Sequence, residues 1–248
     1  MGDQHLALAL TLAVGYAPPA LVQTGSIIQT SGQLAVGTLP VASSSGTTIV
    51  AVLAAGSDVG LGIRTAPSGW RPFTAIMETN SDVEIWVNFN NPGGIQSASF
   101  LAELAASPWS VHLSEWRNCD PTGPVNQIIG SATATSGTTL PLSSVYVTDQ
   151  PGTILPVNGS VVIAAWIQAL AAPNTATFTS PSGFTRLTDN GSSNASNHLD
   201  IEYQINPRKD VPMTPTLVSN RTTSSAAGFV VAIPAGRPST DLSAYLAY

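Results

Sequence analysis

The amino-acid sequence predicts an all-β protein: a jelly-roll-like antiparallel β-sandwich built from two similar halves, with an N-terminal strand arm and a C-terminal tail. Three observations support this prediction. Short apolar segments alternate with clusters of Gly, Pro, Ser and Asn from Gln33 onward, which is typical of antiparallel sandwiches. Several of these segments recur once at a nearly constant offset. An apolar stretch near the start of the chain alternates large and small side chains.

That stretch is Leu6–Val14, with the sequence LALALTLAV, and its period of two predicts a strand. A secretory signal would carry a basic region before the apolar core, but this one is preceded by Asp3. A membrane-spanning helix needs about 20 apolar residues, and Pro18 and Pro19 end the stretch too early. Because both faces are apolar, we expect the strand to be covered. It is either the first strand of the sandwich or an arm that adds to the sheet edge of another subunit.

The apolar segments after Gln33 are the remaining predicted strands. One of them, at 97–104, overlaps a helix-compatible run, but it lies between strand signals and we expect a strand there. The predicted strands are 47–55, 73–78, 83–90, 97–104, 109–116, 130–137, 160–169, 175–180, 198–205, 215–220 and 227–235.

An internal repeat relates these strands. The segment APSGWRPFT at 66–74 recurs as SPSGFTRLT at 180–188. The aligned pairs are Ile49 with Val162, Pro67 with Pro181, and Ile85 with Ile201, at offsets of 113, 114 and 116. Each PSG predicts a turn whose glycine takes a positive φ and whose following aromatic returns to the core. The repeat therefore predicts two halves of similar build, in one sandwich or two tandem ones.

The predicted organisation has three parts. Residues 1–33 form the N-terminal arm, 34–236 the β-sandwich, and 237–248 the C-terminal tail. Within the sandwich the halves run from about 46–120 and 159–234, and the Thr/Ser/Gly-rich segment between them links the halves.

Composition excludes several classes of function. Charged residues make up 9% of the chain, against about 25% in a typical soluble domain, so an interface on this protein buries few charges. The net charge is −6 without a basic cluster, which argues against a nucleic-acid partner. Cys119 is the single cysteine, which excludes an intrachain disulfide and a cysteine-based zinc site. We expect its thiol to be buried or in a loop.

The strand at 198–205 places His198, Asp200 and Glu202 on one face. An imidazole and two carboxylates at this spacing are potential metal ligands. The matching strand of the first half carries Asp82 and Glu84 but no histidine. We therefore expect His198, Asp200 and Glu202 to form an ordinary solvent-exposed face.

Other candidates for chemistry are weaker. Glu103 and Glu115 are carboxylates that a glycosidase would need as a pair, but no motif flanks them, and we expect Glu115 to form an ion pair at the end of its strand. No nucleophile elbow, P-loop or dinucleotide signature occurs. Most tryptophans should be core residues, and Trp109 is the one that we leave open for contact with a ligand. We thus expect no catalytic, cofactor-binding or metal-ligating residues, and no enzyme.

The order of elements over Gly46 to Pro234 resembles that of β-sandwich virion proteins of tailed bacteriophages. An apolar strand, PSGW, a strand ending in Asn, a strand ending in Glu-Trp and a Thr/Ser/Gly-rich segment are followed by the same pattern. The resemblance implies a structural virion protein of the minor tail or tail-associated type, in contact with other virion subunits and with itself. A host cell-surface glycan is a further expected partner, and membrane insertion is not expected. The alternatives are a capsid decoration protein and a glycan-binding module.

Overall fold

The structure of this chain, a computed structural model, is all-β, as the sequence predicts. It describes residues 17–55, 62–78, 81–103, 109–122, 129–134, 137–142, 160–169, 177–190, 197–205, 214–223 and 225–236. These residues form 17 strands, and every strand pair is antiparallel. No helix of the described part of the chain is long and apolar enough to cross a membrane.

The first half of the chain forms two sheets. In the first large sheet the order is β1-β9-β4-β7-β6, and β2 also pairs with β9. In the first small sheet the order is β3-β8-β5. The strands are β1 (Ala20–Thr24), β2 (Ile28–Thr30), β3 (Leu34–Thr38), β4 (Thr48–Ala55), β5 (Ile63–Thr65), β6 (Arg71–Glu78), β7 (Ser81–Asn88), β8 (Ser97–Ala102) and β9 (Trp109–Arg117).

The second half repeats this arrangement. The second large sheet has the order β10-β17-β12-β15-β14, and the second small sheet has the order β11-β16-β13. The strands are β10 (Ile129–Ala134), β11 (Gly137–Pro141), β12 (Ser160–Ala169), β13 (Phe178–Thr179), β14 (Thr185–Asp189), β15 (Asn197–Ile205), β16 (Thr216–Thr223) and β17 (Ser225–Pro234).

The repeat seen in the sequence is confirmed by this strand order. Ile49 lies on β4, between β9 and β7, and Val162 lies on β12, between β17 and β15. The match extends to an irregularity, because the register of β6 against β7 shifts between Pro72 and Thr74, and that of β14 against β15 shifts between Arg186 and Thr188. The two PSG turns also match, with φ of 86° at Gly69 and 82° at Gly183. A bulge and a turn in equivalent places indicate that the halves share one backbone plan.

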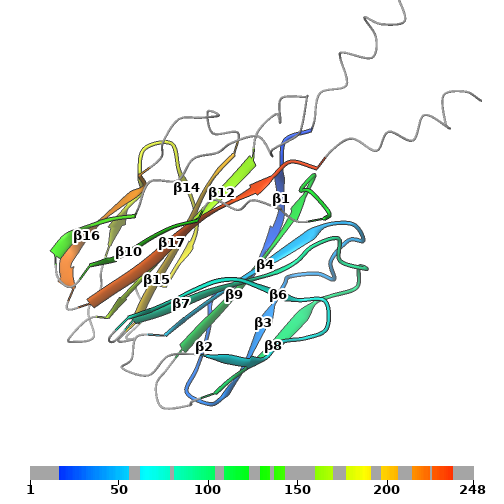
Figure 1. Ribbon diagram of the computed structural model, residues 1–248, viewed down its shortest axis with the longest axis horizontal. Helices are drawn as coiled ribbons and strands as arrows, with labels where there is room; N and C mark the ends of the chain where they lie inside the picture. The colour runs from blue at the N-terminus through cyan, green and yellow to red at the C-terminus, as the bar shows by residue number, and fades with distance from the viewer. Residues whose placement is uncertain are drawn as a thin grey trace, which may run out of the picture.

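The four sheets stack as four layers, which run across Figure 1 from β3 and β8 at the lower right to β16 at the left. One apolar cluster fills the space between the two large sheets, with alternate residues of β4 and β7 facing those of β12, β15 and β17. Each large sheet buries its other face against its own small sheet. Strands of the large sheets are therefore covered on both faces, which explains why β4 and β12 read as continuous apolar runs.

Parts of the predicted arm and linker belong to the sheets. β1 and β2, within residues 1–33, pair with β9, and β10 and β11, within the predicted linker, pair with β17 and β16. The ends of β9 and β17 meet in an isolated bridge between Cys119 and Ala235, which ties the two halves together. Leu6–Val14 and the tail 237–248 lie outside the described residues.

Candidate functional site

The polar face of β15 is not exposed to solvent, so that expectation was wrong. His198, Asp200 and Glu202 do share one face of the strand, but all three are fully buried. The second small sheet covers this face, and the ring of Phe178 on β13 lies edge-on to His198 with centroids 6.2 Å apart. Alternation in a sequence shows that a strand has two faces, but it does not show that a second sheet covers the polar one.

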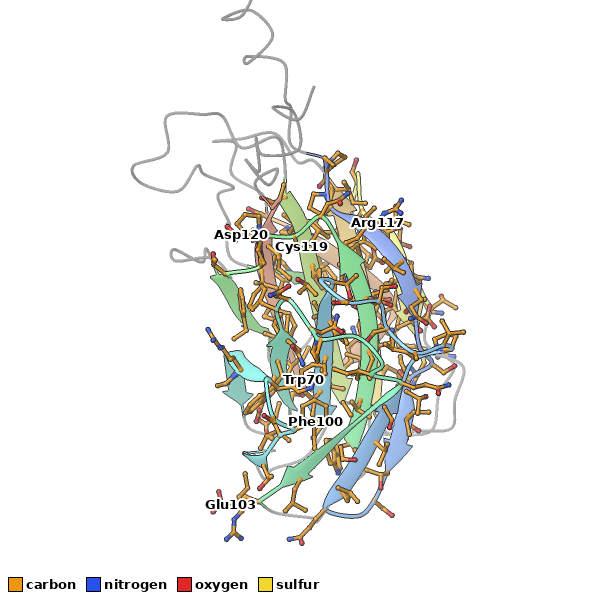
Figure 2. All side chains as sticks on the ribbon, turned by 90° about the vertical axis from the view of Figure 1, so that its right-hand side faces the viewer. Trp70, Phe100, Glu103, Arg117, Cys119 and Asp120 are labelled. Carbon is orange, nitrogen blue, oxygen red and sulfur yellow. The ribbon has the colours of Figure 1, made fainter. Side chains whose placement is uncertain are left out.

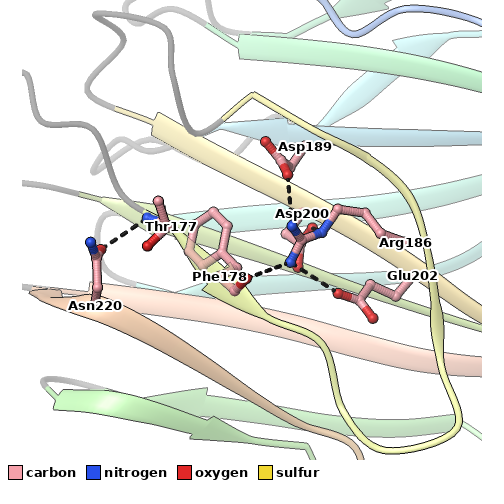
Figure 3. Close-up of polar contacts among 7 residues, drawn as sticks. All are labelled: Thr177, Phe178, Arg186, Asp189, Asp200, Glu202 and Asn220. Carbon is pink, nitrogen blue, oxygen red and sulfur yellow. Dashed lines mark hydrogen bonds and ion pairs between the residues drawn. The ribbon is translucent and has the colours of Figure 1, made fainter.

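Arg186 of β14 organises this polar cluster (Figure 3). Its Nε lies 3.2 Å from Asp200 Oδ1, and its Nη2 lies 3.4 Å from Glu202 Oε1. Nη1 contacts Asp189 Oδ2 at 3.1 Å, and Nη2 donates a hydrogen bond to the carbonyl of Phe178 at 2.8 Å. One guanidinium thus contacts three carboxylates and a backbone carbonyl, which is the fork geometry that arginine provides.

The Asp200 carboxyl is shifted toward its neutral form. Its pKa is raised from 3.8 to about 8, mainly by burial and then by the negative charge of Glu202, while Arg186 opposes the shift. The described residues contain no group of three or more His, Cys, Asp or Glu side chains arranged to hold a metal ion. Asp200 and Glu202 are thus fully buried beneath the second small sheet and in contact with Arg186, whereas Asp189 and Arg186 are partly exposed.

The two glutamates considered as a glycosidase pair lie apart. Glu103 is exposed at one end of the first half, and Arg117, two residues after Glu115 on β9, lies at the opposite end (Figure 2). Glu115 is fully buried, and within the described residues it forms hydrogen bonds and not the expected ion pair. Its carboxylate accepts bonds from Ser44 N at 2.8 Å, Thr47 Oγ1 at 2.7 Å and Gln23 Nε2 at 2.5 Å. Glu115 therefore fastens β1 and the β3–β4 loop onto β9.

Trp109, which the sequence left open for contact with a ligand, is buried in the structure. Its Nε1 donates a hydrogen bond to the carbonyl of Gly32 at 2.7 Å. Trp70 and Trp166 are core residues, as expected, and Trp70 packs edge-on against Phe100 with ring centroids 5.3 Å apart. Cys119 is buried as expected, and burial raises the pKa of its thiol to about 12.

An open pocket of about 560 Å³ lies beside the first PSG turn. Its volume is within the range of sites for small molecules. Three loops build it: the turn before β6, the loop between β7 and β8, and the turn after β9. Its lining includes Ser68, Trp70, Asn88, Phe89, Pro121 and Thr122.

The loops around the pocket are fixed by hydrogen bonds. Trp70 N bonds the carbonyl of Pro67 at 3.3 Å and closes the PSG turn. Asp120 Oδ1 accepts bonds from the backbone N and the hydroxyl of Thr122, at 2.9 and 2.7 Å. In the β7–β8 loop, Asn91 donates to the carbonyl of Thr47 at 3.0 Å and accepts from Gly93 N at 2.7 Å. The walls are thus held in place by the protein itself.

Comparisons with known proteins identify no protein related to this chain. A scan against protein-family models, a search of curated proteins and a search of solved structures found no match to this chain. The pocket and the surface of the two sandwiches are therefore the features from which a function is inferred.

Sequence reasoning did not find the pocket, although one signal for it was present. The PSGW motif predicts a turn with its aromatic in the core, and that is the role of Trp70. The turn also forms one wall of the pocket, together with Phe89 and Thr122, which follow other strands. These pocket residues come together only in the folded sheet, because the strands that they adjoin, β6, β7 and β9, all lie in the first large sheet.

Proposed function

We propose that this chain is a non-enzymatic structural protein of a tailed-phage virion, of the minor tail or tail-associated type. It is assembled in the host cytoplasm, is carried in the extracellular particle, and contacts other virion subunits and copies of itself. The order of elements described above supports this proposal through its resemblance to phage β-sandwich proteins. We also propose that each half is a jelly roll, because each combines a large and a small antiparallel sheet.

The observation that carries the proposal is the distribution of exposed apolar side chains. Among the described residues, four of the five large exposed hydrophobic side chains belong to β1, β3 or the turn after β3. They are Val22, Leu34, Val36 and Val41, and the fifth is Val218 in the second half. Because β1 and β3 are the edge strands of their sheets in the described part of the chain, this edge of the first half combines edge strands with apolar side chains. Such an edge favours association with another chain.

The alternation of β3 places its apolar residues where a partner can reach them. Leu34 and Val36 point outward, whereas the alternating residues Ala35 and Gly37 face the core. On the neighbouring strand β8, Leu101 pairs with Leu34 and Ser99 pairs with Val36, so the outer face combines apolar and small neutral residues. Burying such a face requires little desolvation of charge, which supports a role in assembly.

The arrangement of carboxylates supports a non-enzymatic role. Asp200 and Glu202 are closed off by the second small sheet, and Glu103 and Glu115 do not face one site. General acid–base catalysis needs such groups within reach of the reacting atoms.

Incorporation into particles tests this proposal. The double variant Leu34→Ser/Val36→Ser should fold with an unchanged melting temperature, because both side chains are exposed, but its copy number in purified particles should fall. Val218→Ser in the second half is the matched control and should incorporate normally. Equal incorporation of both variants would contradict a role for this edge. Antibody labelling of particles distinguishes a tail position from the alternative of capsid decoration.

A further inference from the structure

The pocket beside the first PSG turn is lined by a polar side chain that makes no hydrogen bond with the described residues. Asn88, at the end of β7, is only 3% exposed and lines the pocket. Among the described residues, its carboxamide makes no hydrogen bond, and its polar atoms are not among those sealed from solvent without a partner. Asn91, three residues on, is also buried, but its amide bonds Thr47, Gly93 and Ser43. A buried amide without a hydrogen-bond partner among the described residues therefore lines the pocket.

The close approach of the PSG turn fixes the place of this amide. A Cβ atom added at Gly69 would lie 3.3 Å from Asn88 Nδ2, so the glycine backbone packs directly beside the carboxamide. Gly69 also has a φ of 86°, which other residues rarely adopt. The turn thus packs its glycine backbone against the carboxamide, and both Gly69 and Asn88 line the pocket.

The rest of the lining is neutral and amphipathic. Ser68, Asn90 and Thr122 contribute hydroxyl or amide groups, and Phe89 and Pro121 contribute apolar surface. Arg71 is the charged residue among the described lining residues, and no carboxylate is among them. This lining offers a metal ion no carboxylate, imidazole or thiolate ligand. A single exposed arginine in a chain of net charge −6 also gives little attraction for a polyphosphate.

We propose that this pocket binds one saccharide unit of a glycan. A sugar ring presents neighbouring hydroxyls, each a donor and an acceptor, and the free carboxamide of Asn88 has both a donor and an acceptor to match them. The C–H groups of the ring pack against the apolar surface of Phe89 and Pro121. This inference does not rest on the proposed virion role, since it concerns a different surface from β1 and β3.

The test is a titration of the full chain with free monosaccharides, namely glucose, galactose, mannose, rhamnose and N-acetylglucosamine, followed by NMR. The side-chain amide signals of Asn88 and the indole N–H of Trp70 should shift with at least one of these sugars. Asn88→Ala should weaken that binding by at least tenfold while the melting temperature stays within a few degrees of wild type. Asn88→Asp keeps the shape but removes the N–H donors, and it should weaken binding as well.

Gln204 provides the matched control. It occupies the equivalent place on β15, pairs with Val162 as Asn88 pairs with Ile49, and lies beside the second PSG turn. Gln204→Ala should leave the dissociation constant unchanged within twofold. The proposal is overturned if no sugar of the panel shifts Asn88 and Trp70, if Asn88→Ala binds as well as wild type, or if Gln204→Ala weakens binding equally. None of these results affects the incorporation experiment, so the two proposals fail separately.

Discussion

Arg186 Nε lies 3.2 Å from Asp200 Oδ1, and the arginine reaches this fully buried carboxyl from a side chain that is still 32% exposed. The contact joins the edge strand β14 to the interior of the second half. Arg186 also contacts Glu202, so one guanidinium lies against both carboxyl groups on this buried face of β15.

Removal of this cation should destabilise the protein. Arg186→Ala removes the guanidinium that contacts the buried carboxyls of Asp200 and Glu202, and we expect a loss of about 3 kcal/mol in the free energy of unfolding. This is the lower end of the range for a broken buried pair, because Arg186 is partly exposed. Urea denaturation followed by tryptophan fluorescence measures the loss. Arg221→Ala, at an exposed arginine on β16, is the control and should change stability by less than about 0.5 kcal/mol.

A compensating variant checks the reason for this loss. Replacing the carboxyls as well, in Arg186→Ala/Asp200→Asn/Glu202→Gln, removes the charges that Arg186 balances. The triple variant should therefore recover part of the stability lost in Arg186→Ala. A triple variant less stable than the single one would mean that Arg186 acts through packing of its aliphatic stem.

Stability should fall as the pH rises toward 8, because of Asp200. Its pKa is raised from 3.8 to about 8, so the folded state binds this proton more tightly than the unfolded state. The resulting stabilisation is complete below pH 3.8 and is lost as the pH rises to about 8. Asp200→Asn keeps a neutral side chain of the same shape, and its melting temperature should depend less on pH between 6.5 and 8. Parallel curves for Asp200→Asn and wild type in this interval would contradict the assignment.

The thiol of Cys119 should be inert in the folded protein. The thiolate is the reactive form of cysteine, and burial raises the pKa of this thiol to about 12. Ellman's reagent at pH 8 should therefore label the native protein far more slowly than protein unfolded in urea. Comparable labelling rates in the two states would show that the bridge between Cys119 and Ala235 opens readily.

The sequence was sufficient to predict the features of the fold that depend on neighbouring residues. The all-β class and the turn at Gly69 follow from local patterns, and the repeat follows from comparing one half with the other. Burial of the polar residues of β15 and of Trp109 could not be predicted, because both depend on distant segments. Trp109 is covered where its indole reaches Gly32, which is 77 residues away in the chain.

The residues of the candidate site could likewise be predicted only in part from the sequence. Trp70 and Gly69 belong to a motif that the sequence makes visible, but Asn88 is an ordinary residue at the end of a strand. Its importance comes from the lack of a partner in a buried place beside Gly69, and only the packing of three loops shows this.

His112 should make the protein sensitive to acid. It is fully buried on β9, and its Nε2 lies 2.7 Å from Thr24 Oγ1 on β1. Burial lowers its pKa from 6.5 to about 4, against a smaller opposing effect of a hydrogen bond with the backbone of Gly25. The unfolded state therefore binds this proton more tightly, so the stabilisation is complete above pH 6.5 and is lost as the pH falls to 4. A shift of this size corresponds to about 3 kcal/mol.

The measurement that isolates this effect is the difference in unfolding free energy between wild type and His112→Gln across this pH range. Asp200 contributes the opposite slope over most of the same interval, so the wild-type curve alone does not reveal the histidine. In the difference, Asp200 cancels, and wild type should lose stability relative to His112→Gln as the pH falls from 6.5 to 4. Glutamine is polar but does not titrate, so any general loss of packing moves the difference by a constant amount. A difference that stays flat over this range would show that His112 is accessible to protons in the folded state and that the seam between β1 and β9 is open.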